Sequence, residues 1–278
     1  MNNGIRLVAM LAAGLIGPAA MAQESTGDPD VRPAPQGAQV DLTKPFHARS
    51  AWRLVVTEGS STKDYGENDA PGALTLCLRK GAAGPCIADP VTPPAPAHTC
   101  DRCPAWEPHY LLAAKVVYPR GPKAPPVLLI VTGSLNSGDG NQIVATQLVA
   151  YDADRDAFRR VYGNWTGRNN NEEIRFVAKG PLRGSVITAE PQSHSPYGYW
   201  IVVSSPASDG AYRQALRYGS ATRYNDGNSL AVIDAEMPNI LGRLGLWKPG
   251  QPLPTPDSGG QGKRCLKPTL RHSELWCR

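Results

Sequence analysis

The segment VTGSLNSGDGNQIVATQLVAYDADRDAFRRVYGNWTGRNN, residues 131–170, aligns with ITAEPQSHSPYGYWIVVSSPASDGAYRQALRYGSATRYND, residues 187–226. Both read as strand, polar loop, strand, short turn and strand, and the third strand of each contains a Tyr-Gly pair. Those pairs, at 162–163 and 218–219, lie 56 residues apart, and a fainter third copy starts near residue 54. A strand meander repeated at such a period predicts stacked or radial all-β units.

The strand pattern continues outside the repeat. Residues 127–131, VLLIV, form an apolar run typical of a strand buried on both faces, whereas residues 173–179, EIRFVAK, alternate. Two segments favour helix, 208–219 and 239–247, although the repeat assigns strand to the first. We therefore predict an all-β fold of repeated antiparallel meanders, propeller-like or a β-sandwich, stabilised by disulfides. Further strands are expected at 52–57, 73–79, 110–118, 143–151, 157–162, 184–189, 198–204 and 229–234.

Residues 148–162, LVAYDADRDAFRRVY, resemble the outer hairpin of kelch-type propeller blades, in which Tyr-Asp precedes a turn and an aromatic residue. The resemblance covers 15 of the 278 residues. The glycine pair and the blade tryptophan of kelch repeats are absent, so we assign no family. A β-sandwich explains the same alternation equally well.

The first 22 residues have the pattern of a Sec-type signal peptide, with Arg6 as their one charge and a small-residue triplet at 20–22. We expect an exported protein, periplasmic or secreted, without an integral membrane segment. Proline-rich stretches mark the other boundaries, because such a stretch cannot continue a helix or serve as a central strand. The expected organisation is a disordered segment at 23–39, a single all-β domain at 40–248, and a linker with a basic, disulfide-tied tail at 249–278.

The formal net charge of +5 is concentrated in that tail, where residues 261–278 hold five Lys or Arg against Glu274 alone. A nucleic-acid reader needs basic residues aligned on its folded face, so we expect no nucleic-acid partner. For an exported chain the expected partner is an envelope or extracellular protein or glycan.

Six cysteines in an exported chain predict a disulfide framework. Histidines His98 and His109 flank the middle pair, so zinc or a redox dithiol is an alternative there. A structural link is favoured because no strand leads into that pair, and we expect no metal and no cofactor. The predicted local pairs are Cys77 with Cys86, Cys100 with Cys103, and Cys265 with Cys277.

No serine-hydrolase elbow, zinc-protease motif or phosphate-binding loop is present in the sequence. Asp-Gly-Asn at 139–141 and 226–228 predicts tight turns rather than calcium loops, because no closing carboxylate follows. Adjacent Glu172 and Glu173 are expected to point to opposite faces once a strand begins, which weakens them as an acid and base pair. The alternative to a binding function is a carbohydrate-active hydrolase that combines Glu172 or Glu173 with Glu190 or Asp226.

Binding is the leading hypothesis. Polar loops at 134–142, 164–173, 190–199 and 222–228 fall at equivalent ends of the repeat units, and rigid β scaffolds commonly display recognition loops in this way. We expect an exported binding module for a protein or a glycan, while Trp200 is expected in the core. The predicted binding residues are Trp165, Asn169, Asn170, Asn171, Glu173, Tyr197, Tyr199, Tyr224 and Asp226.

Overall fold

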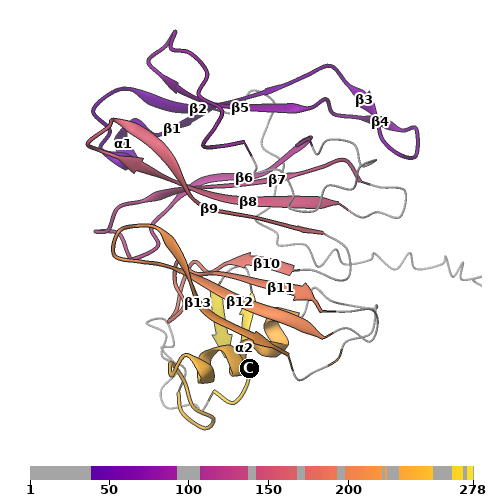
Figure 1. The fold of residues 1–278 in the computed structure, drawn as a ribbon, viewed down its shortest axis with the longest axis vertical. Coiled ribbons are helices and arrows are strands. Elements are labelled where there is room, and N and C mark those ends of the chain that lie inside the picture. The colour runs from indigo at the N-terminus through magenta and orange to yellow at the C-terminus, as the bar shows by residue number, and fades with distance from the viewer. Residues whose placement is uncertain are drawn as a thin grey trace, which may run out of the picture.

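Three antiparallel sheets are stacked on one another in chain order, and a helix with a β-hairpin covers the last of them (Figure 1). The predicted all-β character and the antiparallel sheets are confirmed. The structure is a computed structural model, and it describes residues 39–92, 107–136, 142–167, 173–192, 198–220, 223, 232–252, 265–271 and 274–277.

We name the sheets by their order along the chain. The N-terminal sheet contains β1 (Gln39–Asp41), β2 (Trp52–Glu58) and β5 (Leu74–Lys80). The middle sheet contains β6 (Tyr110–Val117), β7 (Val127–Gly133), β8 (Ile143–Asp152) and β9 (Ala157–Gly167). The C-terminal sheet contains β10 (Glu173–Phe176), β11 (Val186–Pro191), β12 (Tyr199–Pro206) and β13 (Tyr212–Gly219). The remaining elements are α1 (Thr43–Phe46), β3 (Thr62–Lys63), β4 (Asp69–Ala70), α2 (Val232–Arg243), β14 (Pro268–Arg271) and β15 (Glu274–Cys277).

The middle and C-terminal sheets are both four-stranded meanders in which each strand pairs with the next along the chain. The third strands of these two sheets, β8 and β12, begin at Ile143 and Tyr199, which are 56 residues apart in the sequence. The helix considered for residues 208–219 is wrong, because β13 pairs with β12 from Tyr212 to Gly219. The alignment of the two segments therefore predicted this strand better than the helix-start signal did.

Strand β7 lies at the centre of the stack and is buried on both faces, as its apolar run predicted. Leu128 and Ile130 belong to the core shared with the N-terminal sheet. Val127 and Leu129 belong to the core shared with the C-terminal sheet, where they join Val186. Successive side chains of a strand point to opposite faces, so one short apolar segment holds two interfaces together.

Helix α2 covers the outer face of the C-terminal sheet. The strand predicted at 229–234 is wrong over its described part, because residues 232–234 form the first turn of α2. Pairs of buried residues recur every four positions in α2, at 232–233, 236–237 and 240–241, and all of them are apolar except Glu236. Residues with this spacing lie on one face of a helix. The hairpin β14–β15 adds Leu270 and Leu275 to the same core, so folded structure continues beyond the boundary expected at residue 248.

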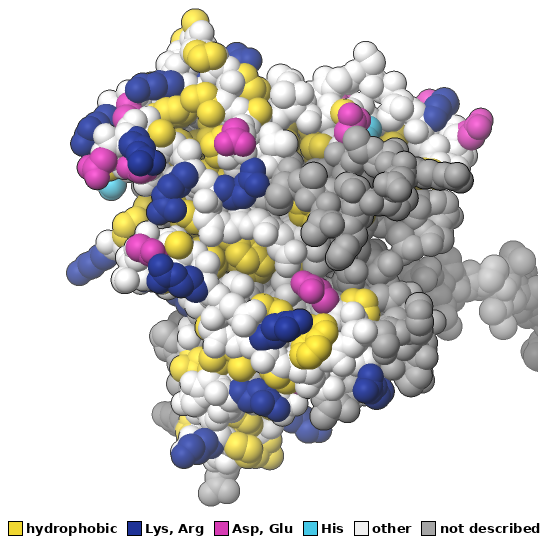
Figure 2. All heavy atoms as spheres, viewed as in Figure 1, with side chains coloured by type: hydrophobic (Ala, Val, Ile, Leu, Met, Phe, Trp, Pro, Cys, Tyr) yellow, Lys and Arg dark blue, Asp and Glu magenta, His cyan; other side chains and the backbone are white. Residues whose placement is uncertain are grey.

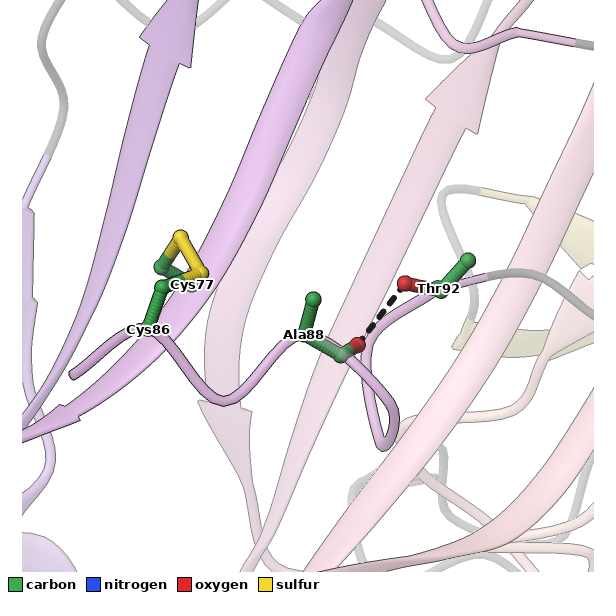
Figure 3. Close-up of a disulfide and its surroundings, with 4 residues drawn as sticks. All are labelled: Cys77, Cys86, Ala88 and Thr92. Atoms are coloured by element: carbon green, nitrogen blue, oxygen red, sulfur yellow. Dashed lines mark hydrogen bonds between the residues drawn. A yellow bond between two sulfur atoms is a disulfide. The ribbon is translucent and has the colours of Figure 1, made fainter.

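Two of the three predicted disulfides are confirmed. Cys77–Cys86 joins β5 to the segment that follows it, and Cys265–Cys277 closes the β14–β15 hairpin. Figure 3 shows the first disulfide and the turn after it, where Thr92 Oγ1 donates to the Ala88 carbonyl at 2.8 Å. The third predicted pair, Cys100 with Cys103, lies outside the described residues.

Asp156, in the turn between β8 and β9, connects the middle and N-terminal sheets. Its carboxylate accepts hydrogen bonds from Ser50 Oγ at 2.6 Å, Trp52 Nε1 at 3.0 Å and Tyr151 Oη at 2.7 Å. Lys80 Nζ completes the set at 2.6 Å. The Lys80 ammonium and these hydrogen bonds hold the pKa of Asp156 well below its usual range.

Arginines connect the middle and C-terminal sheets at the same end of the stack. Arg120 donates to the carbonyl of Ala207 at 2.7 Å, and Arg159 donates to the carbonyl of Asp209 at 3.2 Å. Figure 2 shows Lys and Arg side chains spread over this side of the molecule, on the left of the view. We name this the turn end, because residues 153–156 and 207–211 connect neighbouring strands here.

The sheets are open among the described strands, since the strand orders run from one edge strand to another without closing. The stack has a third sheet and a helical layer, which a two-sheet sandwich lacks. None of the helices in the described ranges is long and apolar enough to cross a membrane.

Candidate functional site

The strand ends opposite the turn end form what we name the loop end. The meander topology brings Gly133, Ile143, Pro191, Tyr199 and Gly219 to this edge, because each stands where its strand enters or leaves a connection. Only a five-residue link separates β9 of the middle sheet from β10 of the C-terminal sheet, so both sheets have their loop ends on the same side (Figure 1). The predicted recognition loops attach here.

Most of the predicted loop residues lie outside the described ranges. This applies to the turns expected at 139–141 and 226–228. The remaining undescribed positions among the predicted site residues are Asn169, Asn170, Asn171, Glu172, Tyr197, Tyr224 and Asp226.

Two neighbouring aromatics have the opposite exposure from the one expected. Tyr199 is 0% exposed and packs in the core beneath α2, so the expectation of an exposed ring is wrong. Trp200, expected in the core, is 37% exposed. The reason is the two-residue period of β12: Tyr199 shares its face with buried Ile201, and Trp200 points the other way. Trp165 on β9 is half-buried.

Glu173 is a core residue rather than an exposed acid. Its side chain is 4% exposed, Oε1 lies 2.5 Å from Arg175 Nε, and Oε2 accepts the backbone N–H of Ile233 at 2.8 Å. That N–H belongs to the first turn of α2, where backbone donors lack partners within the helix. Burial raises the pKa of Glu173 to about 7, against the opposing effect of Arg175 and the helix N–H.

Glu173 and Glu190 cannot flank one substrate bond. Glu173 is the cross-strand partner of Ala189, so both side chains lie on the face that α2 covers. Glu190 follows Ala189 in β11 and therefore points to the opposite face of the sheet. Of the carboxylate pairs considered for a hydrolase, this is the one for which both members are described.

On that opposite face Glu190, Trp200 and Arg217 form a group across three strands. Glu190 of β11 is the cross-strand partner of Trp200, and Trp200 in turn is the partner of Gly219 on β13. Arg217, two residues before Gly219, places its Cζ 4.2 Å from the centre of the Trp200 ring. We name these three residues the Trp200 group.

Small residues and amides frame the Trp200 group at the loop end. A Cβ at Gly219 would lie 2.5 Å from Gln192 Nε2, so the end of the Gln192 side chain packs closely against the backbone of β13 at this point. Gln192 Nε2 donates to the Tyr199 carbonyl at 3.1 Å. A Cβ at Gly198 would similarly lie 2.5 Å from a guanidinium nitrogen of Arg223. The rim of the group is therefore polar and closely packed.

Strand β9 of the middle sheet stands beside the group. Burial raises the pKa of Tyr162 to about 12, and the charge of Glu190 acts in the same direction. The rings of Tyr162 and Tyr212 are 5.6 Å apart, which joins β9 to β13 farther along the same face.

The Trp200 group could not be selected from the sequence, and Arg217 was missed entirely. The available signal was alternation: in β12 and β13, every second residue shares the face of Trp200. A run of three apolar residues, Ile201 to Val203, hid that alternation, because either face was a plausible core face.

The structure contains no group of three or more His, Cys, Asp or Glu able to hold a metal ion among the residues that it describes. Of the residues considered for zinc, His109 is described, and its Nδ1 donates to the carbonyl of Pro71 at 2.8 Å. No protein-family model, curated protein or solved structure matches this chain.

Proposed function

We propose that this protein is an exported binding module that recognises a glycan with the Trp200 group. The observation that carries the proposal is one partly exposed indole on a strand, placed between a carboxylate and a guanidinium. Among the described residues, the side chains of Glu190 and Arg217 have no hydrogen-bond or ion-pair partner. Both groups are therefore available to a ligand. The expectation of export comes from the signal-peptide pattern.

A sugar matches this combination of groups. Its C–H face can lie against an indole, its hydroxyl hydrogens can be donated to Glu190, and its oxygens can accept from Arg217. A standard protein interface instead buries about 800 Å² per partner around an apolar centre. At the loop end of the middle and C-terminal sheets, the exposed large apolar side chains among the described residues are Trp200 and Ile143. A single indole in polar surroundings favours a glycan over a protein.

The hydrolase alternative has less support. A glycosidase needs two carboxyl groups on either side of one bond, at about 5 to 10 Å from each other. Glu173 is buried, ion-paired and on the other face of the sheet from Glu190. The geometry of the described carboxylates therefore supports binding without turnover.

The proposal can be tested by measuring binding to an array of envelope and extracellular polysaccharides. We expect Trp200→Ala to lose at least about tenfold in affinity, because truncating a central aromatic anchor removes a large share of binding energy. Trp276→Ala is the matched control, since Trp276 on β15 is also exposed, at 51%. The proposal is wrong if the wild type binds no glycan, or if both variants bind as well as the wild type. Release of new reducing ends would instead indicate a hydrolase.

A further inference from the structure

Arg217 differs from other arginines of the C-terminal sheet in having no carboxylate partner among the described residues. On the same strand, Arg213 pairs with Asp209 at 2.7 Å. On β10, Arg175 pairs with Glu173 and also lies 3.3 Å from Asp234. Unlike these two, Arg217 is an exposed cation whose described contact is the face of an indole.

Stacking on Trp200 restricts the guanidinium without using its N–H groups. An arginine whose guanidinium lies over an aromatic ring loses less conformational freedom when it binds a ligand. Its planar donors then match the two oxygens of a carboxylate. The aromatic ring thus acts both as a contact for the ligand and as a support for the cation.

The carboxylate of Glu190 does not neutralise Arg217, because β12 separates their strands. Neighbouring strands are about 4.8 Å apart, so β11 and β13 are separated by about 10 Å. Glu190 pairs with Trp200, whereas Arg217 pairs with Val202, two residues along β12. A ligand that contacts the exposed part of the indole can therefore meet an acceptor on one side and a cation on the other.

We propose that the glycan recognised by the Trp200 group is an acidic one, in which a uronic-acid carboxylate binds Arg217 and a hydroxyl group donates to Glu190. This inference rests on the proposed function and specifies its ligand class. Electrostatic attraction between the sugar carboxylate and the unpaired guanidinium provides the preference over neutral sugars. In Figure 2, basic, acidic and hydrophobic side chains lie next to one another in the lower half of the view.

The test compares acidic oligosaccharides with their own neutral derivatives. Oligogalacturonate, oligomannuronate and hyaluronan oligosaccharides are each titrated into the full mature protein by calorimetry, beside the same oligosaccharides after reduction of their carboxyl groups. We expect at least one acidic form to bind about tenfold more tightly than its reduced form, which corresponds to one charge-assisted contact. This preference should decrease as salt is added.

Variants assign the preference to one side chain. Arg217→Gln should remove the difference between acidic and reduced forms, while Arg217→Lys should retain part of it, because lysine keeps the charge without the planar donors. Arg213→Gln, on the same strand, is the control and should leave the preference unchanged. Thermal melts of all three establish that the variants are folded.

The outcomes separate this inference from the proposed function. Equal affinity for acidic and reduced forms, both lost in Trp200→Ala, would overturn the acidic ligand and leave glycan binding intact. Binding of neutral polysaccharides alone on the array would do the same. An acidic preference that persists in Arg217→Gln would also overturn the assignment to Arg217. Absence of binding to any glycan would overturn both.

Discussion

The buried carboxyl of Glu173 makes a specific contribution to the pH dependence of stability. Its pKa is raised from 4.5 to about 7 in the folded protein, chiefly by burial. The folded state therefore holds a proton on Glu173 over a pH range in which the unfolded chain has released it. The resulting contribution to stability is fully present below pH 4.5 and is lost as pH rises through about 7. The size is about 3 kcal/mol, because a pKa that rises from 4.5 to about 7 changes the free energy of unfolding by about 1.4 kcal/mol for each tenfold change in proton affinity.

Urea denaturation of the wild type and of Glu173→Gln, at pH values from about 4 to about 8, measures this contribution. Glutamine cannot titrate, so the stability of the wild type relative to the variant should fall by about 3 kcal/mol across the range. The remaining titratable groups are present in both proteins, and their contributions cancel in the difference. A difference that stays constant with pH would refute the reasoning, and would mean that the ion pair with Arg175 keeps Glu173 charged throughout.

Two further predictions concern the stack itself. Leu128→Ala removes a β7 side chain that is 0% exposed, and it should lower the free energy of unfolding in urea by about 2 to 5 kcal/mol. Leu246→Ala, at a position that is 36% exposed, should cost far less. Equal costs would contradict the central placement of β7 in the stack. Asp156→Asn should lower the thermal midpoint, because the Lys80 ion pair is lost. Since the pKa of Asp156 is lowered from 3.8, the difference in thermal midpoint between wild type and variant should become smaller as pH falls below that value. A difference that becomes larger in acid would contradict a stabilising role of the Asp156 carboxylate.

Local sequence patterns were sufficient to predict the buried central strand and two of the disulfides. The VLLIV run predicted a strand buried on both faces, and short sequence separation predicted the pairs Cys77–Cys86 and Cys265–Cys277. Helix α2 was only partly recognised, because Pro238 lies inside it and proline normally ends a helical pattern. The recurrence of apolar pairs every four residues, on both sides of Pro238, was stronger evidence for a helix than Pro238 was against it.

The role of Glu173 could not be read from its own neighbourhood. The sequence shows two adjacent glutamates after a polar loop, which is a pattern of exposed residues. The partner that determines its burial, the N–H of Ile233, lies 60 residues farther along the chain. Tertiary packing of α2 against the C-terminal sheet thus converts a surface-like acid into a core group, and no local pattern anticipates that contact.

The two faces of β12 explain how the Trp200 group is held in place at the loop end. Tyr199, Ile201 and Val203 are buried beneath α2, and a slip of one residue in register would move all three to the opposite face of the sheet and turn Trp200 toward α2. The position of Trp200 is therefore fixed by the burial energy of the opposite face, not by the conformation of the neighbouring loops. In the function that we propose, this anchoring of β12 preorganises the indole and its guanidinium for the glycan.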